Sequence, residues 1–132
     1  MNRITGPSLR NPLGRARGLG SAKDGTEHFW RQRLTALALI PLVLSFATIV
    51  LRLVGADHAV VIATIGYPPI AGMAVLLIVA GFWHLQLGVQ VVIEDYVHGE
   101  GAKLALQLTS TFACIIVGLA ALFAVLRLAL VS

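Results

Sequence analysis

Residues 82–98, FWHLQLGVQVVIEDYVH, indicate both the fold and the chemistry of this chain. The stretch forms the end of a long apolar run, which contains one histidine, His84. It then ends with Asp95, Tyr96, Val97 and His98. An ionisable side chain inside an apolar membrane helix is costly without a partner, so His84 is a candidate functional residue. The step from His84 to Asp95 is about three helical turns, which places both on one face, about 16 Å apart along the axis.

Small residues surround His84 on that face. Gly81 and Gly88 lie one turn to either side, and Ala80 lies beside them. The pattern predicts a groove with an imidazole in its floor, which suits a flat ligand such as a porphyrin. The alternative is a structural histidine that hydrogen-bonds to a neighbouring helix. No second histidine is expected at this depth, so a six-coordinate haem would take its other ligand from another subunit.

The composition is that of a membrane protein. Of the 132 residues, 58% are hydrophobic and only 12% are charged, and the mean hydropathy is +0.87. Soluble domains have about 25% charged residues. The formal net charge is +4, and most of the basic residues precede Leu34: Arg3, Arg10, Arg15, Arg17, Lys23, Arg31 and Arg33. Because an apolar run follows directly, this bias indicates a cytoplasmic N-terminus rather than a nucleic-acid-binding arm.

The sequence predicts an all-α membrane protein with three transmembrane helices, at about residues 34–53, 68–93 and 103–127. Residues 1–20 are basic and rich in Gly and Pro, which favours a flexible cytoplasmic arm over an organellar transit peptide. Residues 21–132 then form the membrane domain. Residues 21–33 form the approach to the membrane, and residues 54–66 are predicted to be a short outer loop. This topology places the C-terminus on the periplasmic side.

Three polar residues near the cytoplasmic interface are candidate binding residues. Arg33 either anchors the helix in the headgroups or contacts an acidic ligand group such as a haem propionate. Tyr96 is either an ordinary interfacial tyrosine or a hydrogen-bond donor to a quinone carbonyl, with Asp95 setting the local charge. The sequence contains no phosphate loop, no Ser/His/Asp set and no HExxH motif, so it lacks a complete hydrolytic or nucleotide site.

Together these features resemble a known family. The spacing of His84, Asp95 and Tyr96, residues 25–36 (GTEHFWRQRLTA) and residues 103–108 (KLALQL) are similar to the small, three-span, D-type membrane anchor of bacterial succinate dehydrogenase (complex II). The resemblance covers about residues 20–130.

The resemblance implies a role for each candidate residue. His84 matches the axial ligand of haem b, so it would bind the haem iron. Tyr96 and Asp95 match the pair at the ubiquinone pocket, and Arg33 matches the arginine near the haem propionates. The C-type cytochrome b anchor would supply the second haem ligand. A flavoprotein and an iron–sulfur subunit would deliver electrons from succinate to ubiquinone in the inner membrane, as part of the tricarboxylic acid cycle and respiratory electron transport.

Two classes of alternative remain at this point. A fumarate reductase anchor would share the architecture but run the reaction in the opposite direction. A small transporter or scaffold subunit would have no redox cofactor. A transporter would need polar residues along several spans, whereas only the second span has a strongly polar position.

Overall fold

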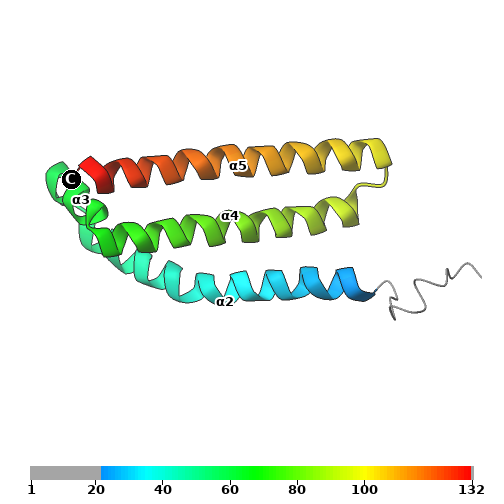
Figure 1. Ribbon diagram of the computed structural model, residues 1–132, viewed down its shortest axis with the longest axis horizontal. Coiled ribbons are helices and arrows are strands. Elements are labelled where there is room, and N and C mark those ends of the chain that lie inside the picture. The colour runs from blue at the N-terminus through cyan, green and yellow to red at the C-terminus, as the bar shows by residue number, and fades with distance from the viewer. Residues whose placement is uncertain (1–21, 132) are drawn as a thin grey trace, which may run out of the picture. The chain divides into compact units, whose positions relative to one another are not determined.

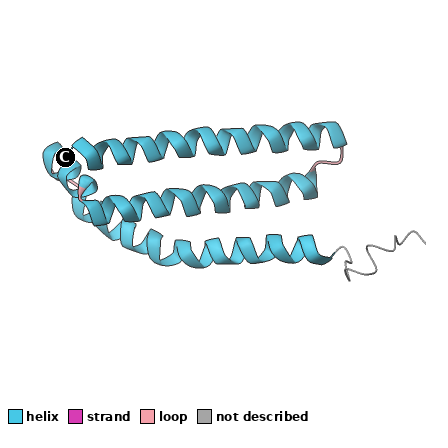
Figure 2. Cartoon of the chain, viewed as in Figure 1, coloured by secondary structure: helices cyan, strands magenta, loops and turns pink. Residues whose placement is uncertain are grey.

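The computed structural model describes residues 22–131, which form four helices (Figure 1): α2 (Ala22–Leu53), α3 (His58–Gly66), α4 (Pro68–Tyr96) and α5 (Glu100–Val131). No strand occurs among the described residues (Figure 2), so the predicted all-α class is confirmed. The predicted arm, residues 1–20, lies outside the described residues. The described chain divides into two units, one ending at Arg31 and the other beginning at Gln32.

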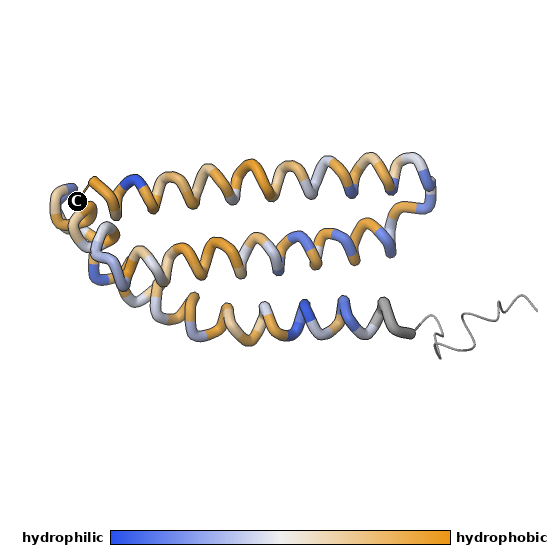
Figure 3. Tube along the Cα trace, viewed as in Figure 1, coloured by the Kyte–Doolittle hydropathy of each residue, from blue (hydrophilic) through white to orange (hydrophobic). Residues whose placement is uncertain are grey.

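Three of the helices are long and apolar enough to cross a membrane: Thr26–Leu53, Pro68–Tyr96 and Glu100–Val131. They have 28, 29 and 32 residues, whereas about 20 residues suffice for a bilayer. Figure 3 shows apolar residues along all three, with hydrophilic positions toward the ends, in the first half of α2 and in the second half of α4. The prediction of three spans is therefore confirmed, although each helix extends beyond the predicted apolar run.

The predicted outer loop, residues 54–66, is wrong in part. Residues 58–66 form the short helix α3 rather than part of a loop, because HAVVIATIG is apolar and has no helix-breaking residue before its last position. The turn between α2 and α3 includes Gly55, whose φ of 82° suits glycine. The approach to the membrane is also helical. There the Arg31 guanidinium pairs with the Glu27 carboxylate one turn earlier on α2.

In the unit that begins at Gln32, α4 packs most extensively on α5, and α3 packs on both. The buried apolar side chains among the described residues are all small or medium-sized: Ala71, Ala74, Leu87 and Ile93. Most large apolar side chains on the long helices are exposed, such as Leu37, Ile116 and Phe123 at 71%, 65% and 70%. So much exposed apolar surface is stable only against lipid or partner subunits.

The α4–α5 contact depends on a glycine. A Cβ added to Gly118 would lie 3.4 Å from Cγ of Phe82 on α4, which is a tight contact. We expect Gly118→Val to force these helices apart and to lower stability by about 1–3 kcal/mol, measured by thermal unfolding in detergent. Gly72→Val is the matched control, because nothing lies within 4 Å of its added Cβ. Equal unfolding temperatures for the two variants would contradict this account of the packing.

Candidate functional site

His84 lies in the middle of α4 and is hydrogen-bonded to α2. Its Nδ1 lies 2.9 Å from Oγ1 of Thr35. The Thr35 hydroxyl also donates to the carbonyl oxygen of Gln32, one turn earlier on α2, at 3.0 Å. A hydroxyl has one proton, so when that proton is given to Gln32 the oxygen accepts from His84 Nδ1–H. In that arrangement the proton is on Nδ1 and the lone pair is on Nε2.

The face of α4 around His84 meets α2 along a short seam, although α4 packs much less extensively on α2 than on α5. A Cβ at Gly88 would lie 3.9 Å from Nε2 of Gln32, and one at Gly81 would lie 3.9 Å from Cδ2 of Leu39. Three residues of α2 therefore face three residues of α4 in antiparallel order. Gln32 faces Gly88, Thr35 faces His84, and Leu39 faces Gly81. The less exposed positions of α2 from Gln32 onward recur mostly every three or four residues, as expected for one face: Gln32, Thr35, Ala36, Leu39, Leu42, Phe46, Ile49 and Leu53.

This seam corrects the prediction of an open groove of small residues. Side chains of α2 reach the two glycines on the Nδ1 side of His84. At both glycines an added Cβ would make only an ordinary van der Waals contact, so neither is required by steric crowding within this chain. A flat ligand would therefore approach the imidazole at its other nitrogen, Nε2.

On its other side α4 is linked to α5 by a similar arrangement. Gln86 Nε2 donates to Oγ1 of Thr111 at 2.7 Å, and the Thr111 hydroxyl donates to the carbonyl oxygen of Gln107 at 2.7 Å. Because His84 and Gln86 are two residues apart, they point about 200° apart around the helix. In each pair a threonine donates within its own helix and accepts from α4. The two pairs fix the rotation of α4 between its neighbours.

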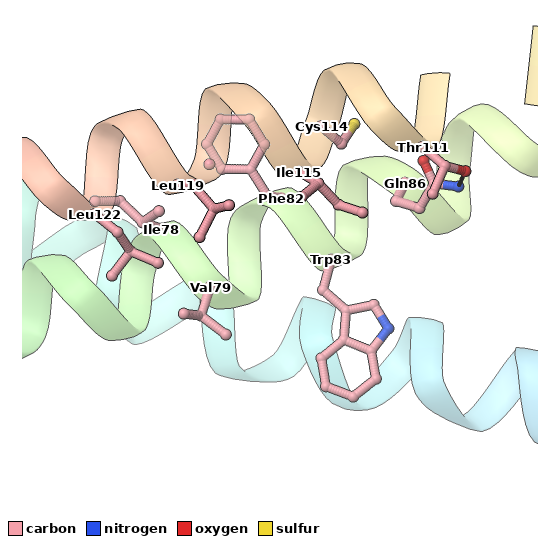
Figure 4. A pocket seen from close by; sticks show the side chains of 11 residues that line it. Ile78, Val79, Phe82, Trp83, Gln86, Thr111, Cys114, Ile115, Leu119 and Leu122 are labelled. Atoms are coloured by element: carbon pink, nitrogen blue, oxygen red, sulfur yellow. Dashed lines mark hydrogen bonds between the residues drawn. The ribbon is translucent and has the colours of Figure 1, made fainter. Parts of the chain in front are cut away.

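The Gln86–Thr111 pair closes one end of an apolar groove between α4 and α5, which has a volume of about 360 Å³ (Figure 4). Figure 4 shows Gln86 and Thr111 meeting at this end, with Cys114 nearby on α5. Otherwise its lining is almost entirely apolar: Ile78, Val79, Phe82, Trp83, Ile115, Gly118, Leu119 and Leu122. Cys114 is a free thiol and is partly exposed.

The remaining candidates lie at one end of the unit that begins at Gln32. Tyr96 is the last residue of α4 and is 78% exposed, and Asp95 beside it is exposed too. Glu94 points elsewhere and accepts a hydrogen bond from Gln90 Nε2 at 2.9 Å. Arg33 is an exposed residue of α2. His84 and Tyr96 are about 18 Å apart along the helix axis, so they occupy separate sites.

Comparison with known proteins assigns this architecture to a family. The family described as succinate dehydrogenase/fumarate reductase transmembrane subunit matches residues 7–126. The chain belongs to this family. The succinate dehydrogenase hydrophobic membrane anchor subunit of Paracoccus denitrificans is 33% identical over 90% of this chain and 92% of its own length. The anchor subunit of the same name from Rickettsia bellii is 32% identical over 67% of this chain and 71% of its own length. No solved structure matches the chain.

Membership in the succinate dehydrogenase/fumarate reductase transmembrane subunit family makes this chain a multi-pass membrane subunit of that class, in agreement with its three apolar helices. It also sets aside the transporter and scaffold alternatives. Neither Thr35 nor Gln86 was identified as a candidate residue from the sequence. Polar residues within apolar helices were the available signal, but pairing Thr35 with His84 requires the register between helices, which one sequence does not contain.

Proposed function

We propose that this chain is the hydrophobic membrane anchor of a succinate:ubiquinone oxidoreductase, and that it supplies one haem b ligand and part of the quinone-reduction site. The family description covers both succinate dehydrogenase and fumarate reductase. The assignment to succinate dehydrogenase is supported by the relatives from Paracoccus, Rickettsia and Reclinomonas americana, all named as succinate dehydrogenase anchors. The chain has no complete active site of its own. Its part in the reaction is to position cofactors.

The orientation of His84 is the main observation that supports the haem assignment. A metal-ligating imidazole donates a lone pair from one nitrogen while the other nitrogen makes a hydrogen bond that fixes the ring. His84 meets the second condition, since Nδ1 is hydrogen-bonded to Thr35. Nε2 would therefore be the iron ligand. When bound, the haem would accept and release single electrons. Because His84 is the one histidine of this sequence that lies inside an apolar run, the second axial ligand is assigned to the C-type anchor.

Arg33 is suited to contact the haem propionates. The Thr35–His84 hydrogen bond fixes the level of α2 relative to α4, and Arg33 lies two residues before Thr35, about 3 Å along the axis. Because α2 and α4 are antiparallel here, Arg33 is displaced toward the end of α4 that carries Tyr96. A guanidinium there would neutralise carboxylates that extend from a haem at the level of His84 toward the interface.

Tyr96 and Asp95 would form this chain's contribution to the quinone site. The Tyr96 phenol is exposed at the end of an apolar helix, where a quinone headgroup can reach it from the bilayer. Its O–H would donate to a quinone carbonyl and would stabilise the negative charge that develops there on reduction. Asp95 would set the local charge and assist in supplying protons.

The remaining partners follow from the proposed complex. A flavoprotein and an iron–sulfur subunit would dock on the side that carries Tyr96, and would pass electrons from succinate toward the quinone. The basic bias before Leu34 supports placing that side in the cytoplasm and the C-terminus in the periplasm. The membrane would then be the bacterial inner membrane.

The test is purification of the complex through a tag on this chain, in mild detergent, from its native membrane. We expect a flavoprotein, an iron–sulfur subunit and a second anchor to copurify, and we expect succinate-dependent reduction of a soluble ubiquinone analogue. A complex that reduces fumarate with a low-potential quinol faster than it oxidises succinate would identify the fumarate reductase alternative. Purification of the chain without these subunits would contradict the anchor role.

A further inference from the structure

Thr35 has an unusual environment for a polar residue of this chain. It is 9% exposed, and among residues 26–131 it is the only polar side chain that is buried. Its neighbours Leu34 and Leu37 are 63% and 71% exposed. A hydroxyl is therefore placed against α4 at a position where an apolar side chain would pack without desolvation. A role for this hydroxyl in hydrogen bonding to the His84 ring would explain why a polar residue occupies the position.

The hydroxyl links the backbone of α2 to the imidazole. Thr35 donates to the Gln32 carbonyl at 3.0 Å, and its oxygen lies 2.9 Å from His84 Nδ1, where it accepts a hydrogen bond when the ring is the Nδ1–H tautomer. The first bond orients the hydroxyl, because the carbonyl belongs to the same helix and cannot rotate away. The second bond then favours one tautomer of His84 and limits rotation of its ring. Both effects direct the Nε2 lone pair away from α2.

We propose that Thr35 is a positioning residue for haem: its hydroxyl, oriented by the Gln32 carbonyl, holds His84 as the Nδ1–H tautomer with Nε2 ready to bind iron. This inference rests on the proposed haem ligation by His84. It assigns a supporting role to Thr35, a residue of α2 that would not itself bind the haem iron. Hydrogen bonding at the outer nitrogen also raises the basicity of the ligating nitrogen, so Thr35 would make the iron harder to reduce.

The test compares Thr35→Val with Thr35→Ser in the intact purified complex. Valine keeps the branched shape but removes the hydroxyl, whereas serine restores the hydroxyl. We expect Thr35→Val to lower haem affinity by about tenfold, the lower end of the effect of removing such a supporting bond. The haem that remains should have a higher reduction potential and altered electron paramagnetic resonance g values. Thr35→Ser should restore the wild-type potential and g values.

Thr48→Val is the matched control. Thr48 is also on α2, and its hydroxyl donates to the Ser45 carbonyl at 2.7 Å in the same internal pattern, but it is exposed. We expect the control variant to keep the wild-type potential and haem content. A Thr35→Val complex with unchanged potential and g values would overturn the proposal, even if its thermal stability fell. Absence of haem from the wild-type complex would refute haem ligation itself, so the two failures are distinguishable.

Discussion

The His84→Ala complex is expected to lose its b-type haem. The substitution removes the only nitrogen that this account assigns to the iron, and no other described histidine lies near the middle of a long helix: His28 is near the start of α2, His58 begins α3, and His98 follows α4. We expect haem affinity to fall by more than about 100-fold, beyond the range for changes to a residue that only supports a ligand. The measurement is haem per flavin in the purified complex.

Two controls separate ligand loss from misfolding. His98→Ala removes an exposed histidine between α4 and α5 and should retain the wild-type haem content. Imidazole added to the His84→Ala complex should restore part of the haem spectrum, because the space left by the side chain accommodates the free ligand. A fully assembled His84→Ala complex with normal haem content would show that His84 is only a packing residue.

Tyr96→Phe is expected to reduce ubiquinone turnover by about 100-fold, the scale observed when one donor to a developing oxyanion is removed. The ring is retained and the side chain is 78% exposed, so assembly and haem content should be unchanged. Succinate-dependent reduction of a water-soluble dye, which takes electrons before they reach the membrane site, should also be unchanged. The loss would therefore be confined to the quinone step.

Tyr67→Phe provides the matched control for Tyr96. Tyr67 immediately precedes α4, at the opposite end from Tyr96, and is 58% exposed. It carries the same phenol at the opposite interface, so its loss should leave ubiquinone turnover unchanged. Normal turnover in Tyr96→Phe, or equal losses in both variants, would rule out the proposed role of the Tyr96 hydroxyl.

The sequence predicted the helical class and the number of spans because both depend on composition along the chain. Runs of apolar residues long enough to cross a bilayer have few structural alternatives. The ends of the helices were predicted less well, because hydropathy marks where a helix would leave the membrane rather than where its backbone hydrogen bonds end. Thus α2 begins at Ala22 and not near Leu34, and apolar residues 58–66 form a helix too short to span.

The candidate site was predicted only in part, for a similar physical reason. His84 could be identified from the sequence alone, because a histidine differs clearly from its neighbours in an apolar run. Its partner Thr35 lies 49 residues earlier, and nothing along the chain pairs the two. The glycines beside His84 were interpreted as a ligand groove, although they face side chains of α2. Both points depend on how the helices pack against each other.

The central claim is that this chain holds one side of a b-type haem through His84. The most direct measurement is a dithionite-reduced minus oxidised absorbance spectrum of the wild-type complex, purified through a tag on this chain. We expect the α band of a b-type haem at about one haem per flavin, the ratio for a single haem shared between two anchors. A complex that contains all of the succinate dehydrogenase subunits and lacks this band would contradict it.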